Sequence, residues 1–279
     1  MQMVKNTGRV LSFVWTHPAN RDHRITSVTR AISFQARGRL GFRTLTTVGT
    51  SGRMWAELHY NAASKVLYAN PPDWNEMQAW RRILSPGDLF VDVGSNVGCY
   101  ALWAGDIGAQ VIAIEPHPPA VQRLRENIAL NQHAISVLEC GLAAESGRMH
   151  LTIDKESTNH LLMDASVDGQ EIAVDTLDNV LGERYAKGVK MDVEGAERLV
   201  LEGASKAMRE KRIEIFQLEW NTLSEDLLGE SRKPLFDILT KHGYKLMKPD
   251  GNGFLCPVGE DWGFSHTDMF AVAPGFQTR

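Results

Sequence analysis

The stretch Phe90-Val-Asp-Val-Gly-Ser-Asn-Val-Gly98 decides the fold of this 279-residue chain. An apolar strand pattern over 89–93 follows the turn residues of 85–88, and a helical pattern begins near 97. In a doubly wound sheet, a glycine turn between a strand and a helix brings the backbone closest to a nucleotide-type cofactor. The stretch therefore predicts an α/β fold with a cofactor site at this turn.

Short apolar runs alternate with helical patterns after the turn, which is typical of βα units and a mainly parallel sheet. We expect further strands over 110–115, 135–139, 189–193 and 213–220, and helices over 118–131, 195–208 and 235–242. A terminal hairpin is expected over 244–248 and 268–273, and an inserted β element near 147–175. These elements place a Rossmann-like domain over 85–279.

Residues 1–84 are expected to form an N-terminal extension made of a basic arm, antiparallel strands around Gly49–Gly52 and a lead-in helix over 75–84. The first 45 residues carry eight Lys or Arg against one Asp, in a chain of formal net charge −4. We expect this arm to pack on the acidic body or on a second subunit, giving a homo-oligomer. Anionic membrane or nucleic acid is the alternative partner.

Composition excludes several classes of protein. With 43% hydrophobic and 23% charged residues the chain is typical of a globular protein. No apolar run approaches the ~20 residues of a membrane span, and the N-terminal apolar run is too interrupted for a secretory signal, so a cytoplasmic location is expected. The three cysteines lack metal-binding spacings and are expected to be free thiols.

The residues around the turn indicate which cofactor fits. Gly94 permits a tight turn and removes a Cβ that would meet a ligand, and Gly98 lets the helix lie close to the sheet. Asn96 replaces the second glycine of a dinucleotide motif, so a pyrophosphate fits poorly. Glu115, 21 residues after Gly94, can accept both hydroxyls of a ribose. Asp92 repels phosphate but suits a cationic ligand, which favours S-adenosylmethionine over NAD.

Several motifs resemble the FkbM family of S-adenosylmethionine-dependent methyltransferases. They are the glycine stretch itself, Ile114-Glu-Pro116, and Lys190-Met-Asp-Val-Glu-Gly-Ala-Glu197, the most specific of the three. The resemblance extends over 67–219, more than half of the chain, with Ser95 and Met191 as mild departures. It carries no information on the choice of substrate.

The resemblance implies a class I methyltransferase with a seven-stranded, mostly parallel sheet that ends in an antiparallel hairpin. It also implies methylation of a hydroxyl on a sugar, glycolipid or polyketide-type natural product, with S-adenosylhomocysteine as the product. The adenine is expected beside Cys140, Gly141 and Leu142. The methionine half is expected beside Asp92, Asn96, Tyr100 and Asp192. The expected cofactor set is completed by Gly94, Ser95, Gly98, Glu115 and Pro116.

Carboxylates at two neighbouring strand ends are the candidate catalytic groups, because a hydroxyl must lose its proton as it attacks. Asp192 is the first choice for the base, Glu219 the second and Glu194 the third, with His160 as an alternative. Glu197 is expected to be structural, facing a helix dipole. Asp192, Glu219 and Asn221 could instead collect Mg²⁺, which we regard as the weaker alternative.

Two other functions remain open from the sequence. One is N-methylation of an amide or amine of a peptide, and the other is a catalytically silent binding module that keeps the cofactor fold. Intact Asp92, Gly94, Glu115 and Asp192 argue against a silent module. The acceptor is a small molecule, glycan or peptide, and the sequence lacks a base pocket typical of nucleic-acid methylation.

Overall fold

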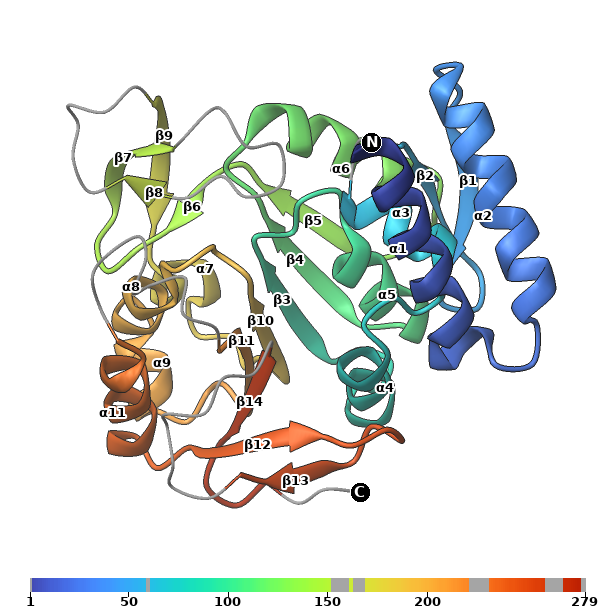
Figure 1. Ribbon diagram of the computed structural model, residues 1–279. Coiled ribbons are helices and arrows are strands. Elements are labelled where there is room, and N and C mark those ends of the chain that lie inside the picture. The colour runs from blue at the N-terminus through green and yellow to red at the C-terminus, as the bar shows by residue number, and fades with distance from the viewer. Residues whose placement is uncertain are drawn as a thin grey trace.

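A single eight-stranded sheet forms the centre of the computed structural model, which describes residues 2–58, 61–151, 161–162, 169–220, 231–258 and 268–276 (Figure 1). The strands, in spatial order, are β13 (Leu255–Pro257), β12 (Lys245–Pro249), β14 (Asp268–Val272), β11 (Ile215–Glu219), β10 (Gly188–Met191), β3 (Leu89–Val93), β4 (Gln110–Ile114) and β5 (Ile135–Leu138).

The strand order creates one crevice for a ligand. The strands from β11 to β5 are parallel, whereas β14 pairs antiparallel with both β11 and β12. The chain runs outward from β3 through β4 to β5 and then returns to β10 on the other side, so the direction of winding reverses beside β3. Ligands bind outside the carboxyl ends of the strands at such a reversal. The class I methyltransferase fold expected from the sequence is confirmed.

One strand was not predicted. The three-residue strand β13 pairs with β12 at the edge of the sheet, in a stretch that the sequence marks as a glycine-rich connection. Its sequence Leu-Cys-Pro is too short to show a period, and proline is tolerated there because an edge strand needs fewer ladder hydrogen bonds. The sheet therefore has eight strands instead of the expected seven.

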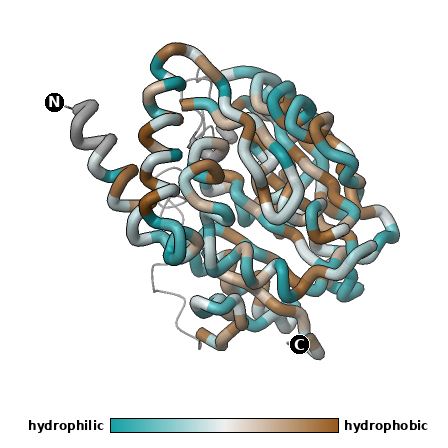
Figure 2. The backbone as a smooth tube through the Cα atoms, turned by 90° about the vertical axis from the view of Figure 1, so that its right-hand side faces the viewer, coloured by the Kyte–Doolittle hydropathy of each residue, from teal (hydrophilic) through white to brown (hydrophobic). Residues whose placement is uncertain are grey.

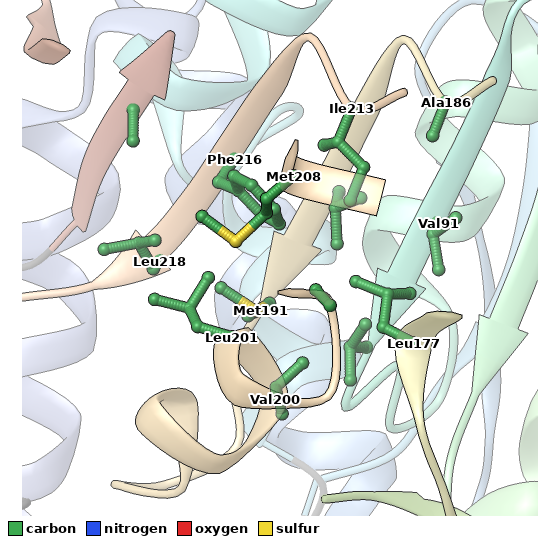
Figure 3. Close-up of a cluster of buried hydrophobic side chains, with 14 of the residues drawn as sticks. Val91, Leu177, Ala186, Met191, Val200, Leu201, Met208, Ile213, Phe216 and Leu218 are labelled. Atoms are coloured by element: carbon green, nitrogen blue, oxygen red, sulfur yellow. The ribbon is translucent and has the colours of Figure 1, made fainter. Parts of the chain in front are cut away.

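Helices cover both faces of the sheet. They are α4 (Trp74–Ile83), α5 (Cys99–Ile107), α6 (Pro118–Ala129), α7 (Leu177–Leu181), α8 (Glu197–Glu202), α9 (Ser205–Arg209) and α11 (Lys233–Lys241). Alternate side chains of a strand point to opposite faces. Phe90 of β3 accordingly packs in one buried cluster with Trp80 of α4, and Val91 packs in another with Val200 and Met208 (Figure 3). Burying one such side chain stabilises the fold by roughly 1.5–3 kcal/mol.

The helix expected over 195–208 is interrupted. The structure has two short helices, α8 and α9, with Gly203 and Ala204 between them. An ideal Cβ on Gly203 would lie 2.2 Å from the carbonyl oxygen of Ala143, so the chain approaches a neighbouring segment too closely for any other residue. The helical period alone gives no sign of this tertiary contact.

A second, four-stranded sheet stands beside the main one. Its strands, in spatial order, are β6 (Gly141–Leu142), β9 (Gln170–Asp175), β7 (Gly147–Leu151) and β8 (Leu161–Leu162). Strands β7 and β9 pair antiparallel over five residues each. The parallel pairing of β6 with β9 fixes the segment that follows β5 at the carboxyl edge of the main sheet.

The N-terminal extension is more helical than expected. Its elements are α1 (Gln2–Thr16), the 3₁₀ turn η1 (Pro18–Asn20), α2 (Arg24–Arg39), β1 (Thr44–Val48), β2 (Gly52–Ala56) and α3 (Asn61–Tyr68). In Figure 2, which looks from the side of α2, hydrophobic and hydrophilic stretches alternate along these outer helices. The boundary between extension and main domain stays a prediction.

The arm packs on its own chain. Val14 of α1, Phe34 of α2 and Leu67 of α3 meet in one buried cluster. The hairpin between β1 and β2 is tied to α5, because the Asp106 carboxylate accepts hydrogen bonds from the backbone N–H groups of Thr50 and Ser51 at 2.7 and 2.8 Å. A homo-oligomer through the arm stays a prediction. None of the helices described is long and apolar enough to cross a membrane.

Candidate active site

A cavity of about 620 Å³ lies over the carboxyl ends of the central strands. Among its walls are the turn after β3, the ends of β4, β10 and β11, and the segment after β5. The predicted site residues that line it are Asp92, Gly94, Ser95, Asn96, Tyr100, Glu115, Pro116, Cys140, Gly141, Leu142, Asp192, Glu194 and Glu219. Residues that are distant in sequence thus meet around one space. His160 and Asn221 lie outside the described residues.

The two glycines of the turn allow close packing against neighbouring segments of the chain. Gly94 has φ +75°, and an ideal Cβ there would lie 1.9 Å from the carbonyl oxygen of Asp192. The expected collision is therefore with the end of β10 and not only with a ligand. Gly98 does not line the cavity; a Cβ there would lie 2.6 Å from Cδ1 of Leu124, so it allows α5 to pack against α6. Asn96 adopts φ 49°, a region that asparagine tolerates better than most residues.

Side chains lock the turn to β4. The Ser95 hydroxyl donates to the carbonyl oxygen of Asp92 at 2.6 Å and accepts from the N–H of Ile114 at 3.0 Å. Ser95 is buried, and its hydroxyl is engaged by these two backbone groups. Its part in the site is to hold the shape of the turn.

Glu115 is held in a fixed orientation at the end of β4. Its Oε2 accepts from the N–H of Asn96 at 2.8 Å, and its Oε1 accepts from the N–H of His117 at 2.9 Å. Burial raises the pKa of Glu115 to about 7, although these two hydrogen bonds lower it. Each carboxylate oxygen has two lone pairs, so each can accept one more hydrogen bond. The carboxylate can thus receive two neighbouring hydroxyls at once.

The role of Lys190 was not predicted from the sequence. Its buried ammonium lies 3.1 Å from Oδ2 of Asp192 and 3.8 Å from Oδ1 of Asp92, and it stands over the ring of Tyr100 at 4.9 Å. Burial raises the pKa of Asp92, and the charge of Lys190 lowers it. A lysine between the apolar residues of a buried strand requires an acidic partner. The sequence Val189-Lys190-Met191 shows this pattern and thus indicates a buried lysine with an acidic partner.

Glu219 is an acidic residue of the cavity with one carboxylate oxygen that accepts no hydrogen bond from the residues that the structure describes. It is half-buried at the end of β11, and within the described residues nothing donates a hydrogen bond to its buried Oε2. Burial, reinforced by the nearby charges of Asp192, Glu197 and Glu194, raises its pKa to about 8. Burial likewise raises the pKa of Glu194 to about 7. Asp192, the first choice from the sequence, is instead engaged by Lys190.

Two residues next to these acids are structural. Glu197 does not line the cavity, and its Oε1 accepts from the N–H of Val193 at 3.3 Å at the start of α8. Trp220, the residue after β11, is fully buried in the core and does not line the cavity.

The extension supplies a further wall, which the sequence did not reveal. Arg9, Val10 and Phe13 of α1 line the cavity, as do Ser64, Lys65 and Tyr68 of α3 and Asp73 before α4. Tertiary packing places these residues, and no local motif marks them. No sequence motif places the arm near the cofactor. Deletion of the arm would nevertheless open the cavity, because Arg9, Val10 and Phe13 line it.

The charges of the site favour a cationic ligand. Asp92, Asp192, Glu194 and Glu219 line the cavity, and one buried lysine lies among them. The described part of the chain contains no group of three or more His, Cys, Asp or Glu side chains arranged to hold a metal ion. A positively charged sulfonium and ammonium would be attracted to these carboxylates.

Curated proteins are similar to this chain in sequence. Hexuronic acid methyltransferase AglP of Haloferax volcanii is 30% identical over 52% of this chain and 63% of its own length. The 31-O-demethyl-FK506 methyltransferase FkbM of Streptomyces tacrolimicus is 29% identical over 44% of this chain and 62% of its own. This chain thus spans about three fifths of the length of these curated relatives.

Similar solved structures include magnesium protoporphyrin IX methyltransferase from Synechocystis with bound SAM. It is 12% identical, with a TM-score of 0.43, over 76% of this chain and 84% of that one. The family described as the methyltransferase FkbM domain matches residues 92–246, which is more than half of the chain and contains the turn, Glu115 and the Lys190–Glu197 segment. This chain therefore belongs to the FkbM methyltransferase family.

Proposed function

We propose that this protein is an S-adenosylmethionine-dependent O-methyltransferase that acts on a hydroxyl of a sugar, glycolipid or polyketide-type natural product. The observation that carries the proposal is the Glu115 carboxylate, which two backbone N–H groups hold at the cavity wall 21 residues after Gly94. A fixed carboxylate at the end of the second parallel strand suits the two hydroxyls of an adenosine ribose.

The rest of the cavity suits the remaining parts of the cofactor. Cys140, Gly141 and Leu142 follow β5 and offer an apolar, close backbone surface for the adenine. Asp92, Asn96, Tyr100 and Asp192 surround the methionine half in this proposal. Their acidity suits a sulfonium and an ammonium, and it disfavours the pyrophosphate of a dinucleotide.

Glu219 is the general base that we propose. The acceptor oxygen attacks the methyl carbon, the bond from sulfur to that carbon breaks, and its electron pair stays on sulfur to give neutral S-adenosylhomocysteine. The hydroxyl proton passes to Glu219. A base is most effective when its pKa lies near the working pH, and Glu219 has a pKa of about 8 and an unengaged oxygen. Asp192, held by Lys190, would orient the acceptor.

Oxygen is the acceptor atom that the relatives favour. One is named for a hexuronic acid and another for 31-O-demethyl-FK506. The test is a panel of glycosides with free hydroxyls, a macrolide with free hydroxyls, and a peptide amine, each incubated with methyl-¹³C-labelled S-adenosylmethionine. We expect an O-methyl resonance from at least one hydroxyl acceptor.

Matched acceptors with the hydroxyls blocked as methyl ethers are the control and should give no product. Label found only on nitrogen would replace the proposal with N-methylation. Binding of the cofactor without transfer to any acceptor in the panel would count against O-methylation of these classes.

A further inference from the structure

The cations of the cavity are not equivalent. Arg9, Lys65 and Lys190 all line it. Lys190 is buried between Asp92 and Asp192 and is neutralised there. Lys65 is exposed on α3 and makes no ion pair with any residue that the structure describes. An anion entering the cavity can therefore be received by Lys65 or Arg9, but not readily by Lys190.

Lys65 lies on the side of the cavity where α5 begins. Cys99 is the first residue of α5 and follows the glycine turn directly. Lys65 belongs to α3, which packs against α5, and both Lys65 and Cys99 line the cavity. Burial raises the pKa of the Cys99 thiol, Asp73 and Asp92 raise it further, and Lys190 and Lys65 lower it. Glu115 and Cys140, in contrast, follow β4 and β5 on the other side of the turn. A ligand whose ribose lies on Glu115 extends its far end toward α5.

The acidic residues that line the cavity would repel one group of the proposed cofactor. The methionine half carries a carboxylate as well as an ammonium and a sulfonium. Asp73, Asp92 and Asp192 would repel that carboxylate, because like charges in a partly desolvated site interact strongly. Binding is therefore favoured by a cation near the far end of the ligand. Of the two cations that can receive an anion, Lys65 lies on α3, which packs against α5, whereas Arg9 lies on α1, which packs against α2 and α3.

We propose that Lys65 binds the carboxylate of the methionine half, so that α3, which lies before residues 92–246, the region that the family model matches, completes the cofactor site. This inference rests on the proposed function and deepens it. Asp73, which lines the same wall, provides the complementary charge for the ammonium. A cation and a carboxylate on one wall match the zwitterion of an amino acid.

The test is a double-mutant cycle between protein and ligand. Calorimetry on the full chain compares S-adenosylhomocysteine with its decarboxylated analogue, 5′-deoxy-5′-(3-aminopropylthio)adenosine, in the wild type and in Lys65→Gln. We expect the wild type to prefer S-adenosylhomocysteine by roughly 10- to 150-fold, the range for a hydrogen bond to a charged group. Lys65→Gln should lose this preference and keep its affinity for the analogue.

Lys245→Gln is the matched control, because Lys245 is an exposed lysine of β12 that does not line the cavity. It should retain the preference, and Lys65→Arg should restore part of it. A preference that persists in Lys65→Gln, or a wild type that binds both ligands equally, would overturn this inference and leave the proposed function standing. A wild type that binds neither ligand would overturn both.

Discussion

Glu219→Gln should reduce the rate of methyl transfer by roughly 10²- to 10⁴-fold, the usual contribution of a general base. The substitution keeps the shape of the side chain and removes its ability to take a proton. The dissociation constant for S-adenosylhomocysteine should change little, because Glu219 is the last residue of β11, whereas the proposed ribose and adenine contacts lie after β4 and β5. Single-turnover transfer at saturating cofactor, measured beside that constant, separates the chemical step from binding.

The dependence of kcat/KM on pH tests the role of Glu219 independently. Because the pKa of Glu219 is raised to about 8, its carboxylate is mostly protonated and inactive as a base at pH 6 and ionised at pH 9. The value of kcat/KM in the wild type should therefore rise with pH through this range and then level off. Glu219→Gln should lose the part of that rise centred near pH 8, whereas Glu115 and Glu194, with pKa values of about 7, titrate at lower pH.

Asp192→Asn is the informative comparison, since the sequence alone favours Asp192 as the base. In the structure Asp192 is engaged by Lys190 at 3.1 Å, so the variant should have a smaller effect on the rate and should keep the pH dependence. A larger loss in Asp192→Asn, with normal turnover in Glu219→Gln, would transfer the role of base to Asp192.

Glu115→Ala should weaken S-adenosylhomocysteine by about 1.5–3 kcal/mol per charge-assisted hydrogen bond lost, which is roughly 10- to 150-fold for the first bond alone. The alanine removes both oxygens that can accept the ribose hydroxyls. It also leaves the N–H groups of Asn96 and His117 without their partner, so some loss of thermal stability is expected. Calorimetry on samples shown to be folded by their melting curves measures the effect. Unchanged affinity in the folded variant would remove Glu115 from the ribose site.

Local patterns were sufficient for the centre of the fold. The short apolar runs of β3 and β4 and the glycines that follow β3 depend on residues close in sequence, and the structure places these strands within one residue of their expected limits. The residues expected around the cofactor, apart from Gly98, also line one cavity, because the carboxyl ends of parallel strands share an edge.

What depends on packing could not be predicted. The break at Gly203 comes from contact with Ala143, and no helical period reveals it. Lys65 and Phe13 reach the cavity because α1, α2 and α3 share a small apolar cluster, which has no motif of its own. The order that we propose for Glu219 and Asp192 as bases likewise rests on burial and on the contact with Lys190, which only the folded chain defines.

Calorimetric titration of the purified protein with S-adenosylhomocysteine and, separately, with NAD is the most direct test of the cofactor. Both ligands carry an adenosine ribose for Glu115, but only NAD carries a pyrophosphate, which Asp92, Asp192 and the absence of a second glycine at Asn96 disfavour. We predict saturable binding of S-adenosylhomocysteine and none of NAD. Saturable binding of NAD with no heat from S-adenosylhomocysteine would contradict the assignment of a methyl donor to this cavity.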